Sequence, residues 1–280
     1  MGKVKKLKAI AGYSHNGIPY NRVGYGPRNL FIFQGLLFEN NPLPRILTPL
    51  YSRHYKYLEK DYTTYLVLRK QGLPEGYSIK DMSDDYATMI QEEIGGPVDV
   101  IGVSTGGSIA QHFAADHPNL IRKLIIHSSA YKLGDLSKSV QMRVGLLAQE
   151  RQWRAAYAAL ASPMLPRSGA MMYIAKPFVW IGSLFAGMFG APKDPSDLVV
   201  TIEAEDKHNF KDRLMQIKAP TLVVAGDKDP FYPAALFRET AEGIPNARLI
   251  LYKGMGHPAS GKQFRRDVLM FLNEGTGEVV

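Results

Sequence analysis

A serine placed between glycines is the feature of this chain that points most directly to covalent chemistry. Gly102-Val103-Ser104-Thr105-Gly106 follows an apolar run typical of a strand and precedes a helical pattern. On a sharp strand-to-helix turn, glycines avoid the clash that other side chains would cause, and the serine hydroxyl is left exposed. The pattern predicts a nucleophile at Ser104. The simpler interpretation is a glycine-rich turn in which Ser104 caps the helix.

A serine nucleophile needs a base, and the chain offers 7 histidines. His257 is preferred because it ends a Gly-Met-Gly-His segment after the last predicted strand, where a flexible loop can bring an imidazole back over the sheet edge. His127 falls inside a predicted strand, which favours a buried structural histidine. His112 and His117 lie in or at the end of the predicted helix after Ser104 and are expected to point away from the serine. The last three histidines are expected at the surface: His15, His54 and His208.

The base in turn needs an acceptor that holds its tautomer. The segment from Ala225 to Pro233 leaves the carboxyl end of a predicted strand, the edge where α/β sheets place their ligands. Asp227 begins this turn and Asp229 follows, ahead of a proline. Residue types alone leave both open, and each has the alternative role of a turn-capping aspartate. Asp135, after an earlier strand, is a third candidate.

Apolar runs of strand length alternate with longer helical patterns along the chain, and these elements must position the candidate residues. This alternation is typical of βαβ units and a mostly parallel sheet. Strands are predicted at 29–34, 64–68, 98–103, 124–128, 221–225 and 248–252. Helices are predicted near 46–60, at 79–93 with Ser78 as cap, from 105 to 117, after Pro233 and from about 261. The serine, acid and histidine candidates therefore each follow a strand.

The alternation stops between about 134 and 205, where helical stretches rich in Arg, Ala and Met are broken by prolines. Within this part, 170–191 is nearly apolar enough to span a bilayer, but its proline, its glycines and its place inside an α/β alternation argue against that. We expect helices that cover a cavity, with Phe178, Trp180 and Phe185 lining a substrate pocket. Ordinary core packing is equally compatible with these side chains.

The order Ser, Asp, His along the chain is that of the alpha/beta hydrolase triad, and the chain resembles this family over nearly its whole length. The resembling segments are Gly76 to Tyr86, the serine elbow, Gly226-x-x-Asp229-x-x-x-Pro233 and Gly256-His257. The resemblance implies an α/β fold with a mostly parallel central sheet flanked by helices. The break in the alternation places the core in residues 1–133 and 206–280 and the helical insertion, which the resemblance identifies as a cap, in 134–205. The resemblance also selects Asp229 as the acid.

The resemblance further implies an oxyanion hole made by two backbone N–H groups, here those of Leu36 and Thr105. Family members usually carry His-Gly after the third strand, whereas this chain has Gln34-Gly35. Because the donor is a backbone group, the hole can persist, although a displaced loop would slow the reaction. Gln34 is instead a candidate to bind substrate. The serine at the elbow argues against the dehalogenase and epoxide-hydrolase branches, which resemble this chain but use aspartate there.

Composition limits the function classes further. Of the 280 residues 45% are apolar, and the absence of Cys excludes a disulfide framework, thiolate metal centres and a cysteine nucleophile. The basic N-terminus lacks the apolar stretch of a secretory signal, so we expect a cytoplasmic protein. Positive charge is concentrated in residues 1–80, and aromatics alternate with cations near 51–60, a pattern that favours an anionic partner or surface. An ordinary helix surface is the simpler interpretation, because no nucleic-acid fold signature accompanies the pattern.

These features together predict a serine hydrolase that cleaves a carboxylic ester with a hydrophobic group through an acyl-enzyme. Ser104 would attack, His257 would carry the proton and Asp229 would orient the imidazole. No cofactor and no metal is implied, and the expected partner is a small-molecule ester, without nucleic acid and without a transmembrane segment. The same triad serves lactonases, amidases, C–C bond hydrolases and perhydrolases, and the fold also yields ligand-binding proteins with little turnover, so these alternatives stay open.

Overall fold

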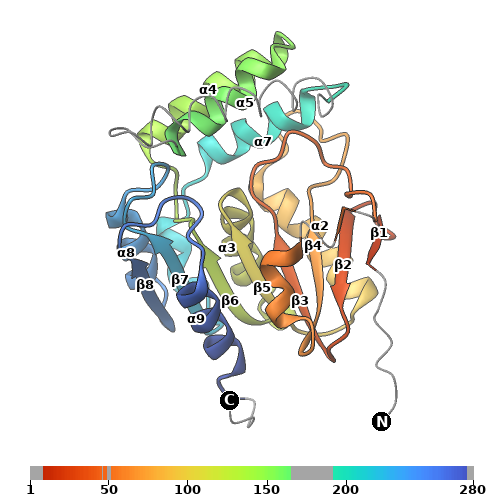
Figure 1. The fold of residues 1–280 in the computed structure, drawn as a ribbon, viewed down its shortest axis with the longest axis vertical. Helices are drawn as coiled ribbons and strands as arrows, with labels where there is room; N and C mark the ends of the chain where they lie inside the picture. Colours follow the sequence, from red (N-terminus) through yellow and green to blue (C-terminus); the bar gives the residue numbers. More distant parts are fainter. Residues whose placement is uncertain (1–8, 46, 49–51, 165–191, 276–280) are drawn as a thin grey trace.

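One central sheet organises the computed structural model, which describes residues 9–45, 47–48, 52–164 and 192–275 (Figure 1). Its 8 strands lie in the order β1-β2-β4-β3-β5-β6-β7-β8. From β4 to β8 in this order neighbours run parallel, whereas β2 pairs antiparallel with both β1 and β4. The strands are β1 (Ile10–Tyr13), β2 (Pro19–Gly24), β3 (Arg28–Phe33), β4 (Tyr62–Val67), β5 (Val98–Val103), β6 (Ile121–His127), β7 (Thr221–Gly226) and β8 (Ala247–Tyr252).

Helices cover the sheet and gather beyond one of its ends (Figure 1). Those packed along the sheet are α2 (Ile79–Glu93), α3 (Thr105–Asp116), α8 (Ala234–Gly243) and α9 (Lys262–Asn273). Those between β6 and β7 are α4 (Asp135–Gln149), α5 (Trp153–Ala161) and α7 (Ser196–Lys207). Short 3-10 helices complete the described chain: η1 (Ser52–Leu58), η2 (Pro118–Leu120), η3 (Ser162–Met164) and η4 (Lys211–Gln216).

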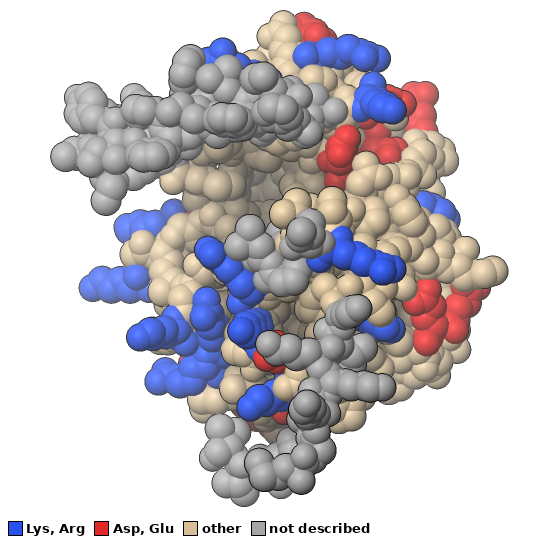
Figure 2. Space-filling view, turned by 45° about the vertical axis from the view of Figure 1, so that its right-hand side comes forward, with Lys and Arg blue, Asp and Glu red and all other residues tan. Residues whose placement is uncertain are grey.

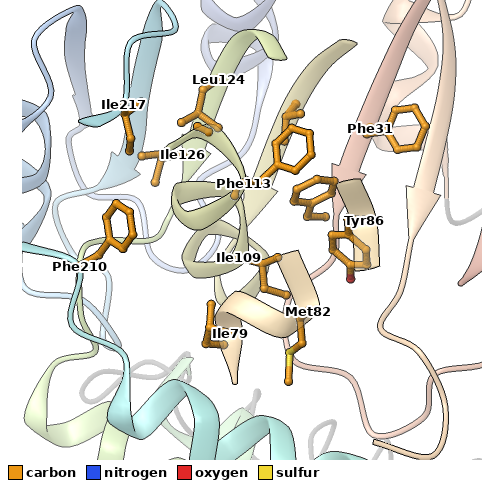
Figure 3. Close-up of a cluster of buried hydrophobic side chains, with 14 of the residues drawn as sticks. Phe31, Ile79, Met82, Tyr86, Ile109, Phe113, Leu124, Ile126, Phe210 and Ile217 are labelled. Atoms are coloured by element: carbon orange, nitrogen blue, oxygen red, sulfur yellow. The ribbon is translucent and has the colours of Figure 1, made fainter. Parts of the chain in front are cut away.

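Both faces of the sheet are buried, because successive side chains of a strand point to opposite sides. On β3, Phe31 and Phe33 face α2 and α3, where Phe33 packs against Tyr86 and Phe113 with ring centroids 4.5 and 5.5 Å apart. Figure 3 shows Phe31, Tyr86 and Phe113 in this cluster. Leu30 and Ile32 of the same strand face the other way, toward η1 and α9. Burial of each such side chain contributes roughly 1.5–3 kcal/mol. The buried strands therefore hold their carboxyl ends in fixed positions.

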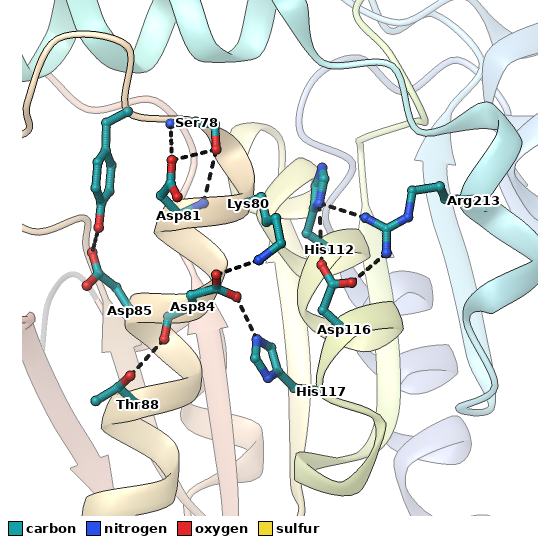
Figure 4. Close-up of polar contacts among 11 residues, drawn as sticks. Ser78, Lys80, Asp81, Asp84, Asp85, Thr88, His112, Asp116, His117 and Arg213 are labelled. Carbon is teal, nitrogen blue, oxygen red and sulfur yellow. Dashed lines mark hydrogen bonds and ion pairs between the residues drawn. The ribbon is translucent and has the colours of Figure 1, made fainter.

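The helix α2 begins with a capping box, as the sequence predicts for Ser78. The Ser78 hydroxyl accepts from the N–H of Asp81 at 3.2 Å, and the Asp81 carboxylate accepts from the N–H of Ser78 at 2.8 Å (Figure 4). One turn further, Asp84 meets Nε2 of His117, at the end of α3, at 2.8 Å. These contacts clamp α2 against the helix that follows the serine turn.

The predicted strands and most predicted helices are found with boundaries shifted by a few residues, and two parts differ. The antiparallel strands β1 and β2 were not predicted, because each is short and only partly buried and gives no strong apolar run. The helix predicted near 46–60 is, over Ser52–Leu58, a 3-10 helix, and only Ser52 and Leu58 of that stretch are buried. The surface position expected for His208 is wrong, because this residue is 5% exposed and its ring packs beside those of His112 and Phe210. The stretch 170–191 lies outside the described residues.

The helices between β6 and β7 share a small apolar cluster with the loop that follows β3. Phe38 of that loop stacks on Tyr157 of α5 at 3.9 Å between ring centroids. The other buried members of the cluster come from α4, α5 and α7: Val144, Ala148, Trp153, Ala156, Leu198 and Ile202. Among the described residues, no helix combines the length and the apolar character needed to cross a membrane.

Candidate active site

Ser104 occupies a sharp turn between β5 and α3. Its φ of 52° and ψ of −124° lie outside the regions that non-glycine residues normally adopt. Its N–H donates to the C=O of His127 on β6 at 3.0 Å, which ties the turn to the sheet. The turn also needs glycine at 106, since a β-carbon there would lie 2.0 Å from the carbonyl oxygen of Phe33. The helix thus starts tight against the end of β3, with Ser104 at its head.

Asp229 and His257 are brought into direct contact by the loops after β7 and β8. Nδ1 of His257 lies 2.8 Å from Oδ2 of Asp229, and the two side chains are 6% and 0% exposed. The other carboxylate oxygen accepts the N–H groups of Phe231 and Tyr232 at 2.9 and 3.1 Å. With its proton on Nδ1, His257 donates to the carboxylate and keeps Nε2 free to accept a proton.

The loop that carries His257 is held from two sides. At Gly226 the chain passes so close that a β-carbon would lie 2.1 Å from the carbonyl oxygen of Met255. Beyond His257, the N–H of Ala259 donates to the Ser128 hydroxyl at 3.0 Å, and its C=O accepts from Nε2 of His127 at 2.7 Å. Burial lowers the pKa of His127 to about 4, so this imidazole is neutral at pH 7.

The remaining acid candidates have other surroundings. Asp227 accepts the N–H of Gly254 at 2.6 Å and so shapes the same pair of loops. Asp135 begins α4, where a carboxylate interacts favourably with the helix N-terminus. Asp229 is thus the candidate whose carboxylate contacts His257.

The serine turn and the Asp–His pair lie along one edge of the sheet. Ser104 follows β5 and Asp229 follows β7, and the sheet order places only β6 between these two strands. Parallel neighbours are about 4.8 Å apart, so the two strand ends are separated by about 10 Å. His257 comes from the loop after the adjacent β8. All three residues therefore lie at the same end of the sheet, where the parallel strands finish.

The two predicted oxyanion donors flank Ser104. A β-carbon at Gly35 would lie 3.3 Å from the β-carbon of Ser104, so the loop after β3 runs directly beside the serine. Within the described part of the chain, the N–H groups of Leu36 and Thr105 have no hydrogen-bond acceptor. Thr105 is the first residue of α3, where an N–H has no partner inside the helix.

A pocket of about 530 Å³ opens beside Gln34. The Gln34 side chain is 8% exposed, and its amide nitrogen lies 3.5 Å from the C=O of Ile32. The apolar part of the pocket lining combines the loop after β3 with β4 and α5: Leu37, Phe38, Pro42, Leu43, Pro44, Leu66, Leu68 and Tyr157. The pocket residues predicted at Phe178, Trp180 and Phe185 lie outside the described residues. A second hollow of about 660 Å³ is lined by His257 and Asp229 and by Met164 of η3.

Sequence reasoning missed two buried charged residues near the serine turn. Arg69, just after β4, is 1% exposed and donates to the C=O of Gly35 at 2.9 Å. Glu205 of α7 is fully buried and accepts from the Thr105 hydroxyl at 2.6 Å. Neither has a local motif. The signal in the sequence is a charged residue after a strand or within a helical pattern, and such a residue is ordinarily assigned to the surface.

Among the described residues, no cluster of three His, Cys, Asp or Glu side chains is arranged to hold a metal ion. Arg53 and Lys56 of the basic segment are exposed on η1, and Arg265 of α9 lies near Tyr57. Figure 2 shows Lys and Arg side chains gathered over part of one face. Exposed cations fit both an ordinary helix surface and an anionic partner, so the choice between these interpretations stays a prediction.

Known proteins resemble this chain in sequence. A model of the Alpha/beta hydrolase family matches residues 38–264. A poly(3-hydroxyalkanoate) depolymerase of Ectopseudomonas oleovorans is 29% identical over 55% of this chain, which spans 52% of that protein. A 2-hydroxy-6-oxononadienedioate/2-hydroxy-6-oxononatrienedioate hydrolase of Pseudomonas sp is 23% identical over 97% of each chain. A non-heme chloroperoxidase, CPO-A1 of Kitasatospora aureofaciens, is 39% identical, but the match covers only 29% of its length.

Solved structures share the architecture. An enol-lactonase from Burkholderia xenovorans LB400 superposes with a TM-score of 0.73 at 20% identity, covering 95% of this chain and 100% of that one. The alpha/beta hydrolase MGS-M2 from a deep-sea metagenome library gives a TM-score of 0.74 at 16% identity, covering 94% and 96%. The family match over most of the chain, together with the parallel sheet and its serine turn, identifies this protein as a member of the alpha/beta hydrolase family.

Proposed function

We propose that this family member is a serine hydrolase that cleaves a carboxylic ester with a hydrophobic group. The observation that carries the proposal is the contact between Nδ1 of His257 and the buried carboxylate of Asp229, along the sheet edge that also presents Ser104. A ligand-binding protein has no need for a strained serine or for a buried Asp–His pair. The combination therefore favours turnover.

In the proposed mechanism, Ser104 attacks the ester carbonyl while Nε2 of His257 takes its proton. Asp229 keeps the imidazole in the tautomer that accepts this proton and stabilises the imidazolium that forms. The N–H groups of Leu36 and Thr105 bind the oxyanion of the tetrahedral intermediate. His257 returns the proton to the leaving alcohol. Water then attacks the carbonyl of the acyl-enzyme while His257 takes its proton, and His257 gives that proton to the Ser104 oxygen as the acid product leaves.

The hydrophobic part of the substrate is proposed from the pocket beside Gln34. Its lining exposes mostly carbon, and Glu39 is the charged residue among the described residues that line it. Transfer of a neutral apolar chain from water into such a site lowers the free energy, whereas a carboxylate would meet no Lys or Arg among the described lining residues. We also propose that residues 134–205 form the cap over an α/β core made by 1–133 and 206–280, since α4, α5 and α7 gather beyond one end of the sheet (Figure 1).

Hydrolysis of a carbon–carbon bond is the second candidate, because the relative that matches 97% of each chain is a dienedioate hydrolase. A dienedioate carries two carboxylates. The apolar pocket beside Gln34 therefore favours the ester over this alternative. A substrate carboxylate in the second hollow would instead meet Lys228, which lines that hollow together with Asp229 and His257, and this contact would favour the dienedioate.

The experiment that tests the function compares wild type with Ser104→Ala and Asp229→Asn on p-nitrophenyl esters of two to twelve carbons. We expect hydrolysis by wild type, loss in both variants and an optimum at medium chain length. An optimum at the acetate would contradict the apolar pocket. If wild type and Ser104→Ala are equally inert on esters, and wild type cleaves 2-hydroxy-6-oxononadienedioate, the second candidate replaces the first.

A further inference from the structure

Two buried charged side chains lie behind the proposed oxyanion donors, one behind each. Arg69 is 1% exposed and Glu205 is fully buried. Burial of an ion costs several kcal/mol unless hydrogen bonds and an opposite charge offset it. Neither residue belongs to the proposed proton relay of Ser104, His257 and Asp229, so their cost calls for another role.

Arg69 holds the peptide that supplies one of the donors. Its Nη1 donates to the C=O of Gly35 at 2.9 Å and lies 3.4 Å from the C=O of Gln34. The C=O of Gly35 and the N–H of Leu36 belong to one peptide group, and in a trans peptide these two bonds point in opposite directions. A guanidinium on the carbonyl side therefore fixes the direction of the Leu36 N–H. It also draws electron density toward the oxygen, which makes the N–H a stronger donor.

Glu205 holds the other donor residue. Its carboxylate accepts from the hydroxyls of Thr105 at 2.6 Å and Ser108 at 3.3 Å, both in the first turn of α3. It also accepts from the Gln141 amide and the Tyr232 hydroxyl, each at 3.2 Å. Tyr232 donates its own N–H to Asp229, so one carboxylate links the start of α3, the helix α4 and the loop of the catalytic acid.

Burial dominates the electrostatics of Glu205 and raises the pKa of its carboxyl group. The hydrogen bonds from Thr105, Gln141 and Tyr232 and, least of these, the positive charge of Arg69 oppose that rise.

We propose that Arg69 and Glu205 are positioning residues that set the two backbone donors of the oxyanion hole, Arg69 through the Gly35–Leu36 peptide and Glu205 through Thr105. The proposal rests on the proposed function, because it gives the Leu36 and Thr105 N–H groups an oxyanion to bind. It also accounts for an active hole in a chain with Gln34 where the family usually has histidine. The loop is held by a cation from the neighbouring strand end.

The test separates transition-state binding from substrate binding. Arg69→Met is expected to lower kcat by about 10²–10³-fold, the usual effect of losing one oxyanion donor, while KM changes less than threefold. Glu205→Gln retains an oxygen that accepts from Thr105 and is expected to lower kcat by about tenfold. Arg69→Lys keeps the charge and is expected to fall between Arg69→Met and wild type.

A control comes from an ion pair at the start of β5, in which Asp99 is buried and Arg122 is exposed. Asp99 at the start of β5 is 0% exposed and accepts from Arg122 at 2.5 and 2.9 Å, at the opposite end of the strand from Ser104. Arg122→Met is expected to lower stability without lowering kcat. If Arg122→Met and Arg69→Met lower kcat equally, Arg69 acts only through folding and the proposal is overturned.

A tetrahedral inhibitor gives a readout that a merely structural role would not move. A trifluoromethyl ketone with a medium-length alkyl chain adds Ser104 to its carbonyl and places an oxyanion in the hole, whereas the methyl ketone of the same length binds without that adduct. Arg69→Met is expected to lose affinity for the trifluoromethyl ketone by the same factor as kcat/KM and to bind the methyl ketone as wild type does. Equal losses for both ketones would overturn the proposal.

Labelling by an alkyl fluorophosphonate distinguishes failure of the proposed function from failure of the positioning inference. It needs no knowledge of the natural substrate. If wild type neither turns over esters nor labels at Ser104, the proposed function fails and this inference fails with it. If wild type labels and folded Arg69→Met labels at the same rate, the function stands and the inference alone is wrong. A slower rate in Arg69→Met, with Arg122→Met at the wild-type rate, supports both.

Discussion

At the scale of single residues, Ser104 is held where a side chain is sterically disfavoured. Its φ of 52° is expensive for any residue with a β-carbon and free of that cost only for glycine. Backbone strain of this kind costs on the order of 1–3 kcal/mol and persists only where the surroundings enforce it. Here the hydrogen bond to His127 and the close packing at Gly106 enforce it.

This strain predicts different stabilities for two variants that lack the Ser104 hydroxyl. Ser104→Gly removes the β-carbon and Ser104→Ala keeps it, so the glycine variant should be more stable by about 1 kcal/mol, although glycine normally destabilises. Urea unfolding of the two variants side by side measures the difference. A glycine variant less stable than the alanine variant would show that the turn carries no strain.

The second residue-scale prediction concerns the two aspartates of one loop. Asp229→Asn removes the carboxylate that fixes the His257 tautomer and is expected to lower kcat by about 10³–10⁴-fold. Asp227→Asn, which disturbs only the bond to Gly254, is the matched control and should cost less than tenfold. The kcat of both variants on esters tests this prediction. A larger loss of kcat in Asp227→Asn than in Asp229→Asn would assign the role of the triad acid to Asp227.

At the scale of elements, the site depends on how closely α3 starts against the end of β3. Ile109 and Phe113 of α3 pack against the sheet and prevent the helix from moving away from it. The loop after β3 cannot move closer to Ser104, because even a β-carbon at Gly35 would lie 3.3 Å from the Ser104 β-carbon. The position of the serine relative to both proposed N–H donors is therefore fixed by packing between a strand and a helix.

Gly106→Ala tests this packing. The added β-carbon would lie 2.0 Å from the carbonyl oxygen of Phe33 and 2.8 Å from that of Gln34, so backbone must move. We expect a loss of roughly 1–3 kcal/mol in the free energy of unfolding and slower fluorophosphonate labelling of Ser104. Gly96→Ala, where nothing lies within 4 Å, is the control and should leave both unchanged.

At the scale of the whole molecule, buried neutral histidines make stability depend on pH. Burial is the first cause that lowers the pKa of His112 to about 4, of His127 to about 4 and of His208 to about 3. The nearby Arg213 lowers the pKa of His112 further (Figure 4). Each therefore stays neutral in the folded state at a pH where the unfolded chain has already taken up a proton.

Stability therefore falls as the pH falls. Below about pH 6.5 the unfolded state binds protons that the folded state does not, so the free energy of unfolding decreases toward pH 4 by up to about 1.4 kcal/mol per pH unit for each histidine. Within the described residues neither ring nitrogen of His208 has a hydrogen-bond partner, so His208→Phe should reduce the slope without loss of stability at pH 7. Urea unfolding at pH values from 7 to 4 measures this slope of the unfolding free energy against pH.

His15→Gln, at an exposed position, is the control and should leave the slope unchanged. If His208→Phe has the wild-type slope, burial of neutral His208 does not contribute to the pH dependence.

The sequence by itself determined the parts of this protein that depend on local pattern. Apolar runs and turn residues predicted the parallel strands, and the glycines around Ser104 predicted the turn, because backbone sterics act between neighbours in the chain. The choice between Asp227 and Asp229 was open from residue types, and only the resemblance favoured Asp229. The tertiary structure brought the Asp229 carboxylate to His257, 28 residues away along the chain.

Only the tertiary structure decided which residues lie behind the serine turn. Arg69 and Glu205 are separated by more than a hundred residues and carry no motif, yet the sheet order and the return of α7 bury both beside it. The weak strands β1 and β2 likewise become visible only once β4 offers an edge to pair with. Burial of a charge and pairing of an edge strand are set by partners distant in sequence, which no local pattern encodes.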